Sequence, residues 1–140
     1  MRPTKHKRGG ASPGPGHISS SFSDAAQIGQ TTIGEVVFQP GVRSRWHAHL
    51  GGQAITVTRG CGWTRRERGP IVCICRGDTA YVPTGIKRWH GATSTKGMPR
   101  LSVTETIGRK TDTWFDPATD AQFLESEVSA KYCYALRFQA

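Results

Sequence analysis

The sequence lacks any long apolar run. No stretch approaches the roughly 18 consecutive apolar residues that mark a membrane-spanning helix. The N-terminus is positively charged but has no apolar segment of the kind found in a secretory signal. We therefore expect no membrane partner and a cytoplasmic location. At 140 residues the chain fits a single domain that is long enough to bury a core.

A zinc-finger pattern is absent as well. The chain has four cysteines, Cys61, Cys73, Cys75 and Cys133. No two of them have the spacing that lets thiolates share a tetrahedral ion. We interpret all four as reduced and structural. Cys73 and Cys75 fall on one face of an expected strand and can belong to the core, which we favour over a redox role.

Helical periodicity is nearly absent, whereas turn residues are frequent, with 17 glycines and 8 prolines. Short β-branched runs alternate with these turns at intervals of roughly 8 to 12 residues, as in a double-sheet jelly roll or a small barrel. We expect an all-β barrel over residues 29–112. One helix is predicted from Thr119 to Glu127 on the outside of the barrel, because Thr119 and Gln122 form a capping box. Residues 113–140 are expected to form a C-terminal helix and tail. Within this segment, residues 131–140 could be an extra strand, an oligomer contact or a loose tail.

Acidic residues are absent before Asp24, and this absence shapes the net charge of +9. Four of the 19 basic residues precede it, so the rest of the chain carries only +5. These four are Arg2, Lys5, Lys7 and Arg8. Residues 1–28 are rich in Gly, Pro and Ser, and we expect a disordered basic arm. Such an arm can touch phosphates without specificity, but an inert extension is the commoner meaning, so nucleic acid is not the expected partner.

Two histidines are spaced for a common site. His47 and His49 are two residues apart, so on a strand both imidazoles leave the same face. Gln53 has the same parity, and its amide oxygen can join them if the intervening turn keeps the register. Imidazole suits manganese, iron, zinc and copper alike. The pattern therefore indicates a possible metal site without specifying the metal.

These residues also belong to two longer motifs that resemble those of the cupin family. The first cupin motif is G-x5-HxH-x3/4-E-x6-G, matched here by Gly41, His47, His49, Gln53 in place of Glu, and Gly60. The second is G-x5-P-x-G-x2-H, matched here by Gly77, Pro83, Gly85 and, at the histidine position, Arg88. The runs WHAHLGGQ, GCGW, RGD and WHGAT are similar to those of small bacterial manganese-dependent hydroxynitrile lyases. The similarity covers about residues 36–125.

The resemblance implies a single-domain jelly-roll β-barrel that acts on a small molecule. It implies Mn²⁺ or Fe²⁺ held by His47, His49 and Gln53, with His90 as the base that helps to cleave a cyanohydrin to an aldehyde and cyanide. It also implies a homodimer or homotetramer. For Trp46, Trp63 and Trp89 we favour packing against the barrel over a role as pocket walls.

Three pocket positions complete the predicted site, and two of them depart from the resemblance. Arg88 has no lone pair with which to coordinate, and its charge repels a dication. Arg100 occupies a position where relatives place a second histidine, and Thr104 shares its strand face. His90 could replace the missing ligand, but the site would then lose its proton acceptor. Besides the lyase, a dioxygenase-like metal enzyme and a non-catalytic cupin that binds a small anion remain open alternatives.

Overall fold

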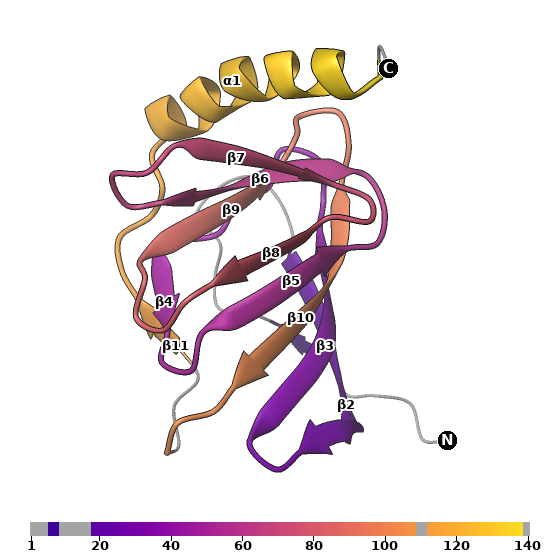
Figure 1. Ribbon diagram of the computed structural model, residues 1–140, viewed down its shortest axis with the longest axis vertical. Coiled ribbons are helices and arrows are strands. Elements are labelled where there is room, and N and C mark those ends of the chain that lie inside the picture. Colours follow the sequence, from indigo (N-terminus) through magenta and orange to yellow (C-terminus); the bar gives the residue numbers. More distant parts are fainter. Residues whose placement is uncertain (1–5, 9–17, 109–111, 139–140) are drawn as a thin grey trace.

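Two β-sheets face each other, and a single helix crosses the outside of one of them (Figure 1). This computed structural model describes residues 6–8, 18–108 and 112–138. Within these ranges no helix is long and apolar enough to cross a membrane. The expected all-β architecture with one C-terminal helix is confirmed.

Each sheet is assembled from strands that are distant in the sequence. The six-stranded sheet has the order β1 (His6–Arg8), β2 (Ile18–Ile28), β3 (Thr31–Phe38), β10 (Met98–Glu105), β5 (Gln53–Val57), β8 (Thr79–Val82). The five-stranded sheet has the order β11 (Asp112–Trp114), β4 (His47–His49), β9 (Arg88–Ala92), β6 (Cys61–Arg66), β7 (Ile71–Cys75). From β4 onward the chain passes repeatedly between the two sheets, and all pairings are antiparallel. This is the strand exchange of a jelly roll.

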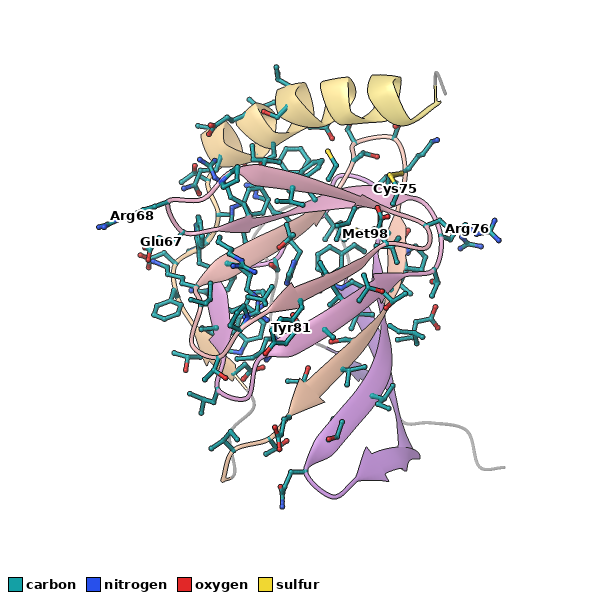
Figure 2. All side chains as sticks on the ribbon, viewed as in Figure 1. Glu67, Arg68, Cys75, Arg76, Tyr81 and Met98 are labelled. Atoms are coloured by element: carbon teal, nitrogen blue, oxygen red, sulfur yellow. A yellow bond between two sulfur atoms is a disulfide. The ribbon has the colours of Figure 1, made fainter. Side chains whose placement is uncertain are left out.

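One end of the space between the sheets is filled by apolar side chains. They are Phe38, Ile55, Val57, Ile74, Ala92 and Met98. Figure 2 shows Met98 between the two sheets, and its side chain has no exposed surface. Burial of each large member contributes about 2 kcal/mol. Along β9 and β10 the inward positions change from apolar to polar beyond Ala92 and Met98, so the opposite end of the interior is polar.

The tryptophans lie on the other face of the five-stranded sheet. Trp89 alternates with inward-facing Arg88 and His90 on β9 and contacts Trp46 and Trp63 edge-on, with ring centroids 6.4 Å and 6.2 Å apart. The helix covers this layer. The tryptophans therefore pack under the helix, as we favoured, and do not line the barrel interior.

The helix α1 (Asp120–Phe138) begins where the capping box predicts. The Thr119 backbone N–H donates to Gln122 Oε1 at 2.9 Å, and the Gln122 backbone N–H donates to Thr119 Oγ1 at 3.2 Å. Its predicted end at Glu127 is wrong, because residues 131–138 continue the same helix. Those residues contain no Gly or Pro to stop it.

Two further expectations about the N-terminal arm need correction. Residues 18–28, expected to be disordered, form strand β2, which pairs with β3 and has an irregularity between Phe22 and Gln27. Residues 6–8 form the short strand β1, which pairs with β2. Composition alone was misleading, because a Ser-rich segment can still add to a sheet edge through its backbone. The remainder of the predicted arm lies outside the described residues.

The prediction that all cysteines are reduced is wrong for two of them. Cys61 and Cys75 form a disulfide, visible beside Cys75 in Figure 2. They are directly opposite each other in the antiparallel pair of β6 and β7, with Cα atoms 4.1 Å apart. Cys73 is buried in the tryptophan layer, as expected for a core cysteine. The side chain of Cys133 lies outside the described part of the structure.

Candidate functional site

All seven predicted site residues are gathered at the polar end of the interior. We call them, together with Ser102, the polar cluster. Its members are His47, His49, Gln53, Arg88, His90, Arg100, Ser102 and Thr104, and none is more than 9% exposed. They come from four strands in both sheets: β4 and β9 on one side, β5 and β10 on the other.

A tight turn carries the chain from the histidines to Gln53. Gly52 adopts φ +78°, and its N–H donates to the His49 carbonyl oxygen at 3.3 Å. A Cβ on Gly51 would lie 2.6 Å from the Glu105 carbonyl oxygen, so the turn packs against the end of β10. The chain leaves one sheet at His49 and enters the other at Gln53, so the amide is placed opposite the imidazoles.

The histidine rings are close together. The ring centroids of His47 and His49 are 5.3 Å apart, and those of His47 and His90 are 5.1 Å apart. Because His47 Nδ1 is 2.8 Å from the Arg45 carbonyl oxygen, Nδ1 carries the proton and Nε2 keeps a lone pair. Neither ring nitrogen of His90 has a hydrogen-bond partner among the described residues, although the ring is fully buried.

Arg88 is bonded to the amide that was expected to bind metal. Its Nη2 donates to Gln53 Oε1 at 2.6 Å, and its Nη1 donates to the Ile86 carbonyl oxygen at 3.2 Å. The Gln53 Nε2 in turn donates to Ser102 Oγ at 2.8 Å. Both ends of the Gln53 amide are thus engaged by the protein.

The residues present do not fit a divalent metal ion. Manganese and iron require several nitrogen or oxygen donors around one point. Gln53 Oε1 already accepts from a guanidinium, and the fourth family position is that cation itself. In the described part of the chain no group of three or more His, Cys, Asp or Glu side chains is arranged to hold a metal. The Mn²⁺ or Fe²⁺ that the resemblance implies is therefore at odds with these side chains, and metal analysis of the purified protein is needed to test it.

Arg100 adds a second buried cation. Its guanidinium carbon lies 4.6 Å from the centroid of the Phe38 ring, a cation–π contact at the border of the apolar core. Arg100 Nε and Nη1, and Arg88 Nε, have no hydrogen-bond partner among the residues described. Among residues 29–108 and 112–129, whose burial the structure describes, no Asp or Glu is buried. Within these residues the interior thus holds two guanidinium groups and no carboxylate.

Burial and these cations keep the imidazoles of His47 and His90 neutral. Desolvation is the main cause that lowers the pKa of His47 and His90 well below the usual value, and the charges of Arg88 and Arg100 lower both further. Burial also lowers the pKa of Arg88 to about 10 and that of Arg100 to about 9. At neutral pH the polar cluster therefore combines neutral bases with two positive charges.

Two contacts of the polar cluster were missed from the sequence. Strand β11 pairs with β4 and brings the Trp114 ring to 5.0 Å from that of His47. Ser102 lies between Arg100 and Thr104 on the same face of β10, and its contact with Gln53 was not predicted. A three-residue strand carries too little periodicity to predict, and the Ser102 contact depends on the pairing of β5 with β10.

Comparison with known proteins agrees with this fold and site. No protein-family model matches the chain. The (R)-mandelonitrile lyase of Granulicella tundricola is 42% identical over 88 residues, which are 63% of this chain and 67% of the relative. A cupin-like protein from Thermotoga maritima is 26% identical with a TM-score of 0.73, covering 79% of this chain and 85% of that one.

A more distant structure shares the fold alone. The DMSP lyase DddQ from Ruegeria pomeroyi has a TM-score of 0.68 at 12% identity, covering 84% of this chain and 64% of that one. The chain is a jelly roll whose polar residues are gathered between its sheets. Barrels of this kind typically bind small molecules in their interior. The chain belongs to the cupin superfamily, and its match to the (R)-mandelonitrile lyase extends over 88 residues.

Proposed function

We propose that this cupin is a lyase that cleaves a cyanohydrin to an aldehyde and cyanide, with His90 as the proton acceptor. The observation that carries the proposal is the state of His90. Its ring is fully buried beside His47, is neutral at physiological pH, and has both nitrogens unpaired among the described residues. The 42% identity to an (R)-mandelonitrile lyase supports this reaction class.

The reaction needs one proton transfer and one bond cleavage. The cyanohydrin hydroxyl gives its proton to the unprotonated nitrogen of His90. The electron pair of the O–H bond forms the carbonyl, and the bond between the carbinol carbon and the nitrile carbon breaks. The nitrile carbon leaves with that electron pair as cyanide and can take the proton back from His90. A general base of this kind contributes about 10²- to 10⁴-fold to the rate.

The two arginines fit the charge that develops in this step. Negative charge grows on the departing cyanide, and the guanidinium groups of Arg88 and Arg100 are fixed cations in a buried setting. Preorganised positive charge stabilises such a transition state more strongly there than it does in water. The same cations lower the basicity of His90, so the proposed enzyme combines a weak base with strong stabilisation of the leaving group.

The experiment is a direct assay of aldehyde release. Purified full-length protein is given mandelonitrile in a mildly acidic buffer, where spontaneous decomposition is slow, with and without a metal chelator. We expect benzaldehyde release above the rate in buffer, insensitive to chelator, and a drop in kcat/KM of at least about 10²-fold in His90→Asn. An exposed substitution on the barrel's outer surface, Tyr81→Phe, is the matched control and should leave the rate unchanged. No release above the buffer rate would refute the proposal.

The assembly state is a separate expectation that comes from the resemblance. We expect a homodimer or homotetramer in solution. Sedimentation equilibrium of the full chain measures it, and a monomer at every concentration tested would contradict it.

A further inference from the structure

The two interior arginines lack the carboxylate partners that buried arginines ordinarily have. Arg88 is fully buried and Arg100 is 3% exposed. The ion pairs found among the described residues join Arg43 to Asp120, Arg65 to Glu125 and Lys87 to Glu67. None of them involves Arg88 or Arg100, so no acidic side chain in the described part of the chain forms an ion pair with either charge.

The two arginines share the polar end of the interior with His47 and His90. Three guanidinium nitrogens are unpaired among the residues that the structure describes: Arg88 Nε, Arg100 Nε and Arg100 Nη1. His47 pairs with Arg88 between β4 and β9, and the ring centroids of His47 and His90 are 5.1 Å apart. Arg88 is also linked through Gln53 to Ser102, which is two residues from Arg100 on β10. A buried, charged N–H group without a partner is unfavourable, so an anion that accepts from these groups gains a charge-assisted hydrogen bond at each.

We propose that Arg88 and Arg100 form a binding site for a small 2-hydroxycarboxylate inside the barrel. The carboxylate accepts from the unpaired guanidinium nitrogens, and its neighbouring hydroxyl donates to a neutral imidazole of His47 or His90. The ligand must be small, because every member of the polar cluster is buried. Glycolate is the smallest molecule with both groups. The site uses the same cluster as the proposed lyase, but binding does not depend on that reaction.

This site would replace the divalent metal of the family pattern. The Arg88 guanidinium donates a hydrogen bond to the amide oxygen of Gln53, so this oxygen is no longer available to a metal ion. Both arginines also repel a dication and attract an anion. The charge of the interior is thus inverted relative to a metal site. A carboxylate matches the positive side chains, whereas a metal ion would need their removal.

Calorimetric titration of the chelator-treated full chain tests the inference. Glycolate, acetate and inorganic phosphate are titrated at constant ionic strength. We expect saturable binding of glycolate that is tighter than that of acetate, because acetate has no hydroxyl for the imidazoles. Arg100→Met should weaken glycolate binding at least about tenfold, in line with the loss of a charged hydrogen bond. Arg76→Met, which removes an arginine from an exposed turn, is the matched control and should change nothing (Figure 2).

Each outcome decides one way. Glycolate binding that is lost in Arg100→Met and kept in Arg76→Met supports the site. If Arg100→Met fails to fold, Arg100→Lys replaces it in the test. This variant keeps the charge and should bind glycolate more weakly than the parent does. No glycolate binding, binding unchanged by both Arg100 variants, or binding that requires added metal would overturn it. Glycolate binding without benzaldehyde release leaves this site standing and refutes only the lyase, whereas release without glycolate binding does the reverse.

Discussion

Replacing Arg100 by methionine should make the protein more stable. The variant keeps an unbranched side chain of similar length against Phe38 but removes a buried charge that has no acidic partner. Replacement of buried charged groups by well-packed apolar residues is often neutral or stabilising. Most substitutions of a fully buried residue destabilise a protein, so the expected sign is the opposite of the usual one.

The magnitude follows from two opposing contributions. The variant removes the cost of two unpaired charged nitrogens, about 1–3 kcal/mol each. It loses the contact of the guanidinium with the Phe38 ring, about 1–2 kcal/mol. We therefore expect a net gain of about 0–5 kcal/mol in the free energy of unfolding, with a midpoint of about 2.5 kcal/mol. A gain at the midpoint raises Tm by roughly 8 °C in a chain of this length.

The pKa of Arg100 gives the same sign and adds a pH dependence. Burial lowers it to about 9 in the folded protein, below its unfolded value. The unfolded state therefore binds more protons above about pH 9, and the stability of the parent rises with pH there. Below pH 9 the destabilisation by the charged side chain is fully present. The advantage of Arg100→Met should thus be constant at neutral pH and shrink in alkaline buffer.

Thermal unfolding followed by circular dichroism measures this difference. The buffer must contain chelator and no carboxylate, because a bound anion would stabilise the parent and hide the effect. Arg76→Met is the control and should melt with the parent. If Arg100→Met instead melts several degrees below the parent in this buffer, Arg100 has a stabilising partner and the reasoning about an uncompensated charge fails.

Two other predictions concern the helix and acid stability. Thr119→Ala removes half of the capping box and should lower the free energy of unfolding by about 1 kcal/mol in urea titrations. Thr119→Ser keeps a hydroxyl and should retain most of the parent's stability. Equal stability of the parent and both variants would contradict the role of the cap. Because the folded-state pKa values of His47 and His90 lie below the unfolded value, the unfolded state binds more protons below about pH 6.5 and stability should fall as the pH drops. His90→Gln should flatten that fall, and identical pH profiles for variant and parent would exclude His90 as its source.

The sequence could predict which side chains meet in the interior, because strand alternation is a local rule. His47 and His49 differ by two positions, as do Arg88 and His90, so each pair had to share a face. Gln53 was expected to share their face if the turn kept the register, and this is wrong, because the Gly-rich turn carries the chain to the other sheet and places the amide opposite the imidazoles. Their roles in metal binding or catalysis stay predictions, because the proximity of these side chains does not show which reaction or ligand they serve.

The contacts that decide the chemistry depend on the fold as a whole. The bond from Arg88 to Gln53 crosses between the two sheets, and the two residues are 35 positions apart in the chain. The disulfide between Cys61 and Cys75 depends on the register of one hairpin, and a shift by one residue would separate the sulfurs. Strand β2 was missed because its polar composition hides a pairing made by the backbone. None of these contacts has a short-range signal.

We infer that the interior of this cupin is built for an anion and not for a divalent metal. Elemental analysis of manganese and iron in the purified parent and in Arg88→His tests it most directly. The account predicts substoichiometric metal in the parent and a clear gain in the variant, because histidine frees Gln53 Oε1 and supplies a further nitrogen donor. One tightly bound equivalent of metal in the parent would contradict it.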